Sequence, residues 1–407
     1  MSVPEFLLKY MVEYDKSAPL DIPTEEREKW RLGNDALLSN AMLVRRGVLN
    51  CITMVTRVSF NVQRGVIILE LSNGVRGIAV GVDEDNIKDV VSAPIEVIIA
   101  RSQSVPVIHI KRIYGRVDNA DELIDKLREE NVPLYDALLM GFGYKPCDKA
   151  RVLMLPRILS LFRVNGMPLY TLQITPRATG KTEFGTRVRD ILNWAYTGEA
   201  PSFAFLIYDA RTRSIGQVFL RNGIVFDGID KWGEKIWNIS TDYELLLTGM
   251  EQGVWSRGVS GAPVSGRKYV NMLFFGNVID ASLQRLPDRE CTVAAISIFG
   301  DPEPFLDRIV LTHYSLDRVD INELVTGRVL PDSVMRYLIN HVQELIDRDS
   351  TVYTSNLEGR LSRHSASFQK AVRNMGVSVD SDTADVIVGK GLDYALNVEN
   401  VSIDWGD

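Results

Sequence analysis

A short loop, TPRATGKT, constrains the fold of this chain most, and it runs from Thr175 to Thr182. It follows an apolar, strand-like segment, LYTLQI, and precedes a helix-like one, TEFGTRVRDILNWAY. In that context GxxxxGK[ST] binds phosphate, because backbone N–H groups surround phosphate oxygens while the lysine and the hydroxyl contact phosphate and magnesium. Gly180, Lys181 and Thr182 fit the pattern, whereas Thr175 replaces its first glycine. The loop predicts binding of ATP and Mg²⁺; the alternative is a chance GKT at a helix start.

Three apolar strands are predicted after the loop, and each ends on a polar residue. A magnesium-holding aspartate is expected at the end of a second strand in such sites. FAFLIYD ends at Asp209 and GIVFD ends at Asp227, so both are candidates. The third segment, VNMLFFGN, ends at Asn277, whose amide could reach the γ-phosphate or the attacking water. Each strand alone is more often plain core, but three in series behind a phosphate loop favour a site.

The order of the predicted elements indicates an α/β fold. Strands alternate with helices from residue 150 onward, which favours a mainly parallel sheet. Earlier segments are rich in Val, Ile and Thr and are separated by Gly, Asn or Pro, which favours a small barrel or sandwich, with the OB type as a candidate. We expect five parts: a helical segment (1–40), a β-rich domain (41–118), a helical linker (119–149), the α/β core (150–318), and a helical lid with a loosely organised tail (319–407).

Composition narrows the class of protein. Charged residues make up 24% of the chain and the net charge is −7, so the whole molecule is not a polycation built for nonspecific nucleic-acid binding. A local basic face is expected near Arg45 and Arg46, although solvated positions are the simpler interpretation. The 3 cysteines are widely spaced, so neither a zinc site nor a disulfide framework is predicted. No apolar run is long enough for a membrane span, and we expect a cytoplasmic protein without membrane partners.

The chain resembles a known family, the Lon-like AAA+ ATPases of BREX phage-defence systems, relatives of MCM helicases and of the ATPase part of Lon proteases. TPRATGKT is similar to the family's GPRGTGKS loop. NGIVFDGIDKW is similar to its WDxVxFDE element, which selects Asp227 over Asp209. MEQGVWSRG, NMLFFGNV and PEPFLDRIV resemble its MESGxFSRG, VFVGN and F-x-DR-I segments, and LYDALLMGFGYKP resembles a segment upstream. Only residues 41–115 find little match. The resemblance implies an AAA+ P-loop core behind the β-rich, OB-like domain.

The resemblance also implies a hexameric ring with ATP between subunits, and it implies roles for individual residues. Lys181 and Thr182 would bind phosphates and magnesium, and Asp227 would be the Walker B carboxylate. Asn277 would be sensor 1, and Arg308 would be the arginine finger that enters the neighbour's site. Arg363 is a candidate for sensor 2, with Arg373 as its competitor.

A pore hairpin that contacts DNA lies in MCM-like relatives between the segments equivalent to MEQG and NMLFF. In this chain the segment carries Arg257, Arg267 and Lys268. A solvated loop is the alternative interpretation. The resemblance therefore implies DNA as a partner, with phosphate contacts that do not depend on sequence.

Two departures from the family pattern bear on activity. Gly228 occupies the position of the catalytic glutamate, and Thr175 occupies that of the first loop glycine. We therefore expect nucleotide binding with slow hydrolysis, Asp230 standing in for the glutamate, and faster turnover in Gly228→Glu. The alternative function is nucleotide-gated assembly or DNA binding with little hydrolysis. The Lon-type protease domain of the BREX proteins has no counterpart in this sequence, so proteolysis is not implied.

Overall fold

The structure is a computed structural model, and it describes residues 3–14, 19–61, 65–82, 90, 94–101, 105–114, 120–198, 202–209, 214–231, 240–257, 264–278, 303–397, 399 and 401–406. The chain forms two compact units. The larger comprises Met1–Lys9, Asp121–Arg328 and Met335–Asp407, and the smaller comprises Tyr10–Ala120 and Val329–Val334. The finer division into five parts remains a prediction.

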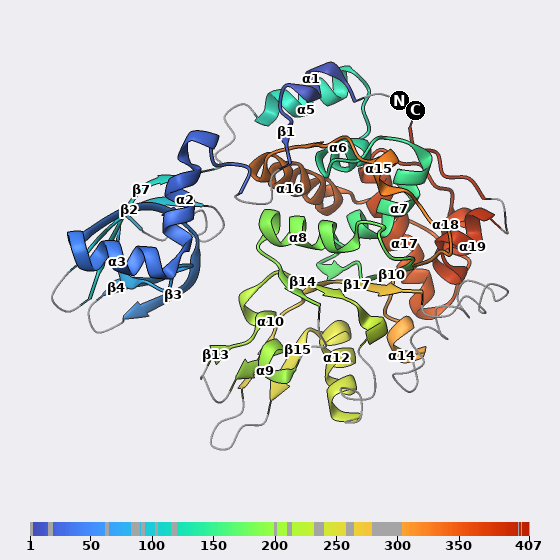
Figure 1. Ribbon diagram of the computed structural model, residues 1–407. Helices are drawn as coiled ribbons and strands as arrows, with labels where there is room; N and C mark the ends of the chain where they lie inside the picture. The colour runs from blue at the N-terminus through green and yellow to red at the C-terminus, as the bar shows by residue number, and fades with distance from the viewer. Residues whose placement is uncertain are drawn as a thin grey trace. The chain divides into compact units, whose positions relative to one another are not determined.

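A five-stranded sheet forms the centre of the larger unit (Figure 1). Its strand order is β11-β14-β17-β10-β18, and every neighbouring pair is parallel. The strands are β10 (Thr171–Thr175), β11 (Ala195–Thr197), β14 (Gly223–Asp227), β17 (Asn271–Asn277) and β18 (Leu311–Tyr314). Because all five run the same way, their carboxyl ends meet at one edge of the sheet. The predicted parallel α/β sheet is confirmed, and so are the strands that end at Asp227 and Asn277.

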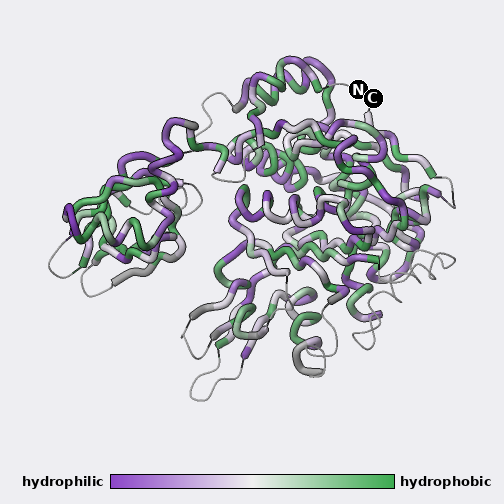
Figure 2. Tube along the Cα trace, viewed as in Figure 1, coloured by the Kyte–Doolittle hydropathy of each residue, from purple (hydrophilic) through white to green (hydrophobic). Residues whose placement is uncertain are grey.

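Helices cover both faces of this sheet, and side chains alternate between the faces. Leu172 and Ile174 join a core with one set of helices, α9 (Phe203–Leu206), α10 (Gln217–Leu220), α12 (Ser240–Gln252) and α14 (Glu303–Leu306). The intervening Thr171 and Gln173 bond to carbonyls of α7 (Asp148–Leu159), and α8 (Lys181–Leu192) packs on β14. Figure 2 shows hydrophobic residues along the central strands, which are buried on both faces, as parallel strands usually are.

The segment FAFLIYD is not a strand of this sheet. It forms the short helix α9 and then β12 (Tyr208–Asp209), which pairs only with β13 (Ser214–Ile215) among the strands described. The prediction of a long strand here was wrong, because a continuous apolar run suits a buried helix as well as a strand. Asp209 therefore does not end a strand of the five-stranded sheet.

The C-terminal part is helical to near its end. It contains α15 (Ile321–Leu324), α16 (Asp332–Arg348), α17 (Gly359–Asn374), α18 (Ser381–Lys390) and α19 (Leu392–Asn397). The backbones of Ser378 and Asp404 bond to each other, and the Trp405 ring lies 5.2 Å from that of Tyr135. The expected loosely organised tail is therefore wrong, since the last residues described pack on the larger unit.

Six strands form the sheet of the smaller unit, in the order β2-β6-β7-β5-β4-β3. They are β2 (Val48–Thr53), β3 (Val55–Asn61), β4 (Val66–Leu71), β5 (Arg76–Val80), β6 (Ile95–Ala100) and β7 (Val107–Ile113). The edge strands β2 and β3 are joined by the single residue Met54, so the sheet must curl until its edges approach each other. Two helices, α2 (Arg27–Asn34) and α3 (Ala36–Arg46), precede it. The sheet lies within the segment expected to be β-rich, while the bounds of that domain and its assignment to the OB type remain predictions.

The remaining elements are short. At the start of the predicted helical segment, the structure has only the short helix α1 (Glu5–Leu8), followed by β1 (Val12–Glu13). The others are α5 (Ala120–Glu129), α6 (Leu134–Gly141), β8 (Arg163–Val164), β9 (Met167–Pro168), β15 (Val254–Arg257), β16 (Val264–Arg267), β19 (Arg328–Val329) and the 3₁₀ turns η1 (Thr24–Glu26) and η2 (Ile229–Lys231). Of the helices in the described ranges, none combines the length and the apolar character that crossing a membrane requires.

Candidate functional site

The predicted phosphate loop connects β10 to α8, as the sequence indicates. Gly180 precedes the helix with φ of +74°, in the left-handed region that favours glycine. A Cβ on Gly180 would lie 2.7 Å from the Tyr144 hydroxyl, so a side chain would also have to displace its neighbour. Ala178 takes φ of +65° in the same loop, which is strained for an alanine. The loop thus keeps a glycine-like path with one glycine in place of several.

Lys181 lies in the hollow of this loop and is 6% exposed. Its Nζ donates to the carbonyls of Thr175 and Pro176, both at 2.9 Å, and to the Thr175 hydroxyl at 3.0 Å. Burial, together with the nearby Arg157 cation, lowers the pKa of Lys181 from 10.5 to about 8, although Asp227 and Asp230 oppose the shift. Thr175, which replaces the first glycine of the motif, therefore accepts hydrogen bonds from the lysine.

Thr182 and Asp227 meet at the carboxyl edge of the sheet. The Thr182 hydroxyl donates to Asp227 Oδ2 at 2.6 Å. Tyr196, on β11, donates its hydroxyl to the same oxygen at 2.6 Å. Burial and the contact with Asp227 raise the pKa of Tyr196 well above its usual value, so it stays a donor. Sequence reasoning selected Thr182 and Asp227 but missed Tyr196, which no motif marks.

Asn277 and Asp230 form a second polar pair at this edge. Asp230 Oδ1 accepts from the Asn277 backbone N–H at 2.9 Å and from its side-chain amide at 3.3 Å. Asp230 lies in η2, directly after the strand that ends at Asp227. The intervening Gly228 has φ of +84°, and its N–H donates to the Phe275 carbonyl at 2.9 Å. A glutamate at Gly228 would be strained, so the faster turnover predicted for Gly228→Glu is no longer expected.

A buried arginine supports the loop from behind. Arg157, on α7, is 0% exposed and donates to the Thr179 carbonyl at 2.9 Å and to Gln173 Oε1 at 2.7 Å. Gln173 in turn bonds to His313 at 3.0 Å. Burial and the nearby cations Arg157 and Lys181 lower the pKa of His313 to about 3, so the ring is neutral. Sequence reasoning missed Arg157, because a lone arginine in an apolar helix has no recognisable spacing.

The residues at this edge suit a nucleotide and magnesium. Lys181 supplies a cation within a loop whose backbone leads into a helix N-terminus, a combination that attracts phosphate. Mg²⁺ usually takes one or two protein oxygens and completes its shell with substrate phosphates and water. Thr182 and Asp227 provide a hydroxyl and a carboxylate in contact with each other. In the described part of the chain no cluster of three or more His, Cys, Asp or Glu forms an all-protein metal cage.

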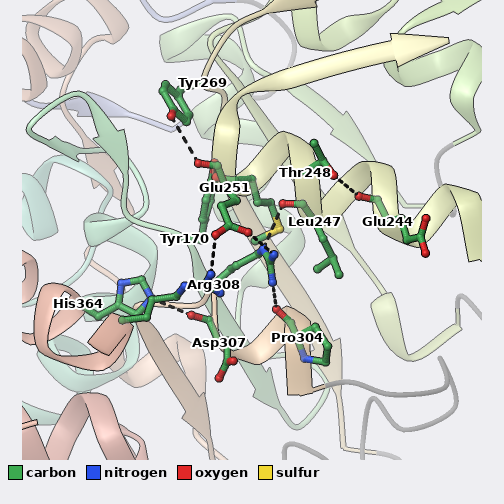
Figure 3. Close-up of polar contacts among 12 residues, drawn as sticks. Tyr170, Glu244, Leu247, Thr248, Glu251, Tyr269, Pro304, Asp307, Arg308 and His364 are labelled. Carbon is green, nitrogen blue, oxygen red and sulfur yellow. Dashed lines mark hydrogen bonds and ion pairs between the residues drawn. The ribbon is translucent and has the colours of Figure 1, made fainter. Parts of the chain in front are cut away.

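Arg308 lies at the amino ends of the strands of the five-stranded sheet, whereas Lys181 lies at their carboxyl ends. The structure therefore does not bring Arg308 to Lys181 of the same chain. It precedes β18, and the backbone of Val310 bonds to that of Tyr170 just before β10, at the amino ends of both strands. Glu251 accepts from Arg308 Nη2 at 2.5 Å (Figure 3). It also accepts from Arg360 Nη2 at 2.7 Å. The Arg308 Nε donates to the Leu247 carbonyl at 3.1 Å.

The two candidates for sensor 2, Arg363 and Arg373, both lie on α17 and are exposed. Arg373 is in the last turn of the helix. Arg363 lies one helical turn after Arg360, which bonds to Glu251, and on the same side of the helix. The structure does not decide between Arg363 and Arg373, and the sensor 2 role stays a prediction.

The predicted hairpin is present as β15 and β16, which pair antiparallel. Arg267 is exposed, and its Nε donates to the Gln252 carbonyl at 3.2 Å. Arg257 bonds to the Tyr208 carbonyl, and Lys268 Nζ donates to the Arg221 carbonyl at 2.8 Å. Burial lowers the pKa of Lys268. All three side chains bond to backbone carbonyls, and Arg267 is the one of the three that is exposed.

In the smaller unit, Arg45 and Arg46 are exposed in the last turn of α3, and Gly47 ends the helix with φ of +70°. Their positive charge stabilises the C-terminal end of the helix, and contact with DNA stays a prediction.

Comparisons with known proteins agree with this geometry. The profile of a family described as "Lon-like protease BrxL-like, ATPase domain" matches residues 117–370. An uncharacterized protein of Acidianus filamentous virus 1 is 31% identical over 294 residues, which cover 67% of this chain and 68% of the relative. Uncharacterized proteins of Sulfolobus islandicus rod-shaped virus 1 and Acidianus filamentous virus 2 are 31% and 30% identical, and the matches span 61% and 58% of their lengths.

Proposed function

Since the chain belongs to the family of BrxL-like ATPase domains of Lon-like proteases, we propose that it is an AAA+ ATPase that binds ATP and Mg²⁺ at Lys181, Thr182 and Asp227. The 2.6 Å contact between Thr182 and Asp227 carries this proposal. It joins the hydroxyl that follows the phosphate-loop lysine to a carboxylate at the end of a neighbouring strand, as a magnesium site beside the β/γ-phosphates requires.

Slow hydrolysis is part of the proposal. The attacking water must be aligned with the γ-phosphate, and positioning is most of what the protein contributes to phosphoryl transfer. Bound Mg²⁺ would neutralise charge on the phosphates. Gly228 has no side chain, whereas Asp230 holds a carboxylate beside Asn277. We assign water positioning to Asp230, with Asn277 fixing the orientation of that carboxylate.

A ring with shared sites is the proposed assembly. Arg308 lies at the edge of the sheet opposite to the loop, so it can serve a phosphate only in a neighbouring subunit. Mixing Lys181→Ala subunits with Arg308→Ala subunits should restore part of the activity, because some mixed interfaces pair an intact loop with an intact arginine. Activity that never exceeds that of either variant across a mixing series would contradict a shared site.

DNA is the proposed substrate of the assembly. Arg45, Arg46 and Arg267 are exposed cations that would contact phosphates. The relatives above are proteins of viruses, which supports a role in the maintenance of a mobile element. A role in defence is supported only by the match to the BrxL-like family.

One experiment separates an ATPase that acts on DNA, here called a motor, from the alternative function, a nucleotide-gated binding protein. ATP turnover is measured with and without double-stranded DNA, alongside sizing of the protein in each condition. A motor predicts turnover that DNA stimulates and that Lys181→Ala abolishes. Assembly driven by ATP, with no ATP turnover in either condition, would favour the nucleotide-gated binding protein.

A further inference from the structure

Tyr196 brings a hydroxyl group to the nucleotide site from the edge of the five-stranded sheet. It lies on the edge strand β11 and pairs with Val225 of β14. Val225 and Asp227 are two residues apart on that strand, so their side chains lie on the same face of the sheet. Because paired residues of neighbouring strands share a face, the Tyr196 ring lies on the face that α8 covers, beside Asp227.

A glycine on α8 makes room for this ring. A Cβ on Gly185 would lie 2.8 Å from Tyr196 Cε2, and 3.0 Å from both Tyr196 Cδ2 and Val225 Cγ1. Carbon atoms pack at roughly 3.5–4.0 Å, so a side chain at Gly185 would push the ring away from the helix. Glycine destabilises a helix interior relative to alanine, and here it permits the close approach of the tyrosine.

The two hydroxyl groups that contact Asp227 leave only one of its oxygens available. Thr182 and Tyr196 both donate to Oδ2, each at 2.6 Å. A carboxylate oxygen has two lone pairs, so these donors fill the hydrogen-bonding capacity of Oδ2. Among the described residues, none donates to Oδ1. Asp227 therefore offers a cation one oxygen, Oδ1, either directly or through water.

A single available carboxylate oxygen suits Mg²⁺ better than Ca²⁺. Mg²⁺ requires nearly octahedral coordination and usually takes few protein oxygens, with phosphates and water completing its shell. Ca²⁺ takes about 6–8 oxygens and often uses both oxygens of a carboxylate. A hydroxyl group that occupies Oδ2 therefore disfavours Ca²⁺ without contacting the ion itself.

We propose that Tyr196 is a positioning residue that sets the cation specificity of the nucleotide site, because it keeps Oδ2 of Asp227 occupied and leaves Oδ1 for Mg²⁺. Gly185 belongs to the same arrangement, since it lets the ring reach the carboxylate. The tyrosine acts only through Asp227. This inference rests on the proposed function, because it requires ATP and a divalent cation at Lys181, Thr182 and Asp227.

Equilibrium binding of ATP to the full chain tests the inference, and it is measured without a divalent cation, with Mg²⁺ and with Ca²⁺. The specificity ratio is the factor by which Mg²⁺ tightens ATP binding, divided by the corresponding factor for Ca²⁺. Tyr196→Phe removes only the hydroxyl group and should lower this ratio about tenfold, since one hydrogen bond to a charged group is lost. ATP affinity without a divalent cation should change by less than about twofold, because Lys181 is untouched.

Gly185→Ala should also lower the specificity ratio, because the added Cβ displaces the tyrosine ring. Since both residues act through one contact, Gly185→Ala should change the ratio little when it is added to Tyr196→Phe. The matched control is Tyr337→Phe on α16, where the lost hydroxyl group donates to Asp121 at 2.5 Å. This variant also loses a hydrogen bond between a tyrosine and an aspartate, and it should keep the ratio of the parent chain.

Asp227→Asn separates a failure of this inference from a failure of the proposed function. If Asp227→Asn loses the effect of Mg²⁺ while Tyr196→Phe keeps the specificity ratio of the parent chain, the inference is overturned and the proposed site stands. Equal losses of the Mg²⁺ and Ca²⁺ effects in Tyr196→Phe also leave the ratio unchanged, and they would show a purely structural role. If Asp227→Asn keeps the full effect of Mg²⁺, the proposed function fails and the inference fails with it.

Discussion

The Thr182 hydroxyl donates a hydrogen bond of 2.6 Å to the Asp227 carboxylate, across 45 residues of sequence. The contact exists because β10 and β14 are parallel strands of one sheet, so the helix start after β10 and the last residue of β14 reach the same edge. The Tyr196 hydroxyl fixes the same carboxylate oxygen. The candidate site is thus arranged by hydrogen bonds between protein groups alone.

The lowered pKa of Lys181 predicts a pH dependence. Between pH 8 and the usual 10.5 the unfolded chain holds a proton that the folded chain has lost, so this group's contribution to the free energy of unfolding rises with pH. Phosphate favours the charged amine, so nucleotide binding should take up a proton in this window and weaken as pH rises above 8. Calorimetry at pH 9 in two buffers of different ionisation enthalpy measures that uptake.

The control for that titration is Lys149→Met, at an exposed position, which should leave proton uptake unchanged. Identical binding enthalpies in both buffers for the parent chain would show that Lys181 is already charged at pH 9.

Ala178→Gly should stabilise the protein. Ala178 has φ of +65°, which costs an L-residue roughly 1–2 kcal/mol, while glycine loses about 0.5–1 kcal/mol more through its flexibility in the unfolded chain. The net gain in the free energy of unfolding is at most about 1.5 kcal/mol, and denaturant titration measures it. Ala371→Gly, in the interior of α17, should change stability in the opposite direction. A loss of stability in Ala178→Gly would mean that the loop takes another path.

Asp230→Asn should abolish ATP turnover and leave ATP binding within about twofold. An asparagine at this position can still accept a hydrogen bond from the Asn277 backbone N–H, but it carries no negative charge. The attacking water therefore loses the carboxylate that positions it, while Lys181, Thr182 and Asp227 remain. Steady-state turnover and equilibrium binding are compared in the same preparation. Glu129→Gln, at an exposed position on α5, is the matched control. Turnover that survives in Asp230→Asn would remove Asp230 from the mechanism.

DNA affinity should fall steeply with salt and depend little on sequence. Each phosphate contact contributes about 0.9 to the slope of log K against log salt, so Arg45→Gln and Arg46→Gln together should reduce that slope by up to about 1.8. Lys268→Gln should change it little, since its amine bonds to backbone carbonyls. A filter-binding titration from low to moderate salt measures these slopes, and an absence of binding at low salt would instead favour a protein partner.

Sequence patterns predicted those parts of the site that come from contiguous segments. Gly180, Lys181 and Thr182 are adjacent, and Asp227 ends an apolar run that could only be a strand or a buried helix. Tyr196 and Arg157 were missed because nothing in their neighbourhood marks them; only the folded sheet and α7 bring them to the loop.

Helices α18 and α19 were missed, in the segment expected to be a loose tail, although signals were present. Asp380 caps α18 by accepting from the Thr383 N–H, and Gly391 follows its last residue. An N-cap aspartate and a following glycine are the usual limits of a helix. The strand predicted for FAFLIYD was wrong for the opposite reason, because a continuous apolar run has no periodicity that distinguishes a helix from a strand.

The most direct test of the composite site is the effect of magnesium on ATP affinity in Asp227→Asn and Asp209→Asn. In the parent chain magnesium should tighten ATP binding by at least about tenfold, or about 1.4 kcal/mol. Asp227→Asn should lose that gain, while Asp209→Asn, on β12 outside the five-stranded sheet, should keep it. A gain that survives in Asp227→Asn and disappears in Asp209→Asn would contradict the site described here.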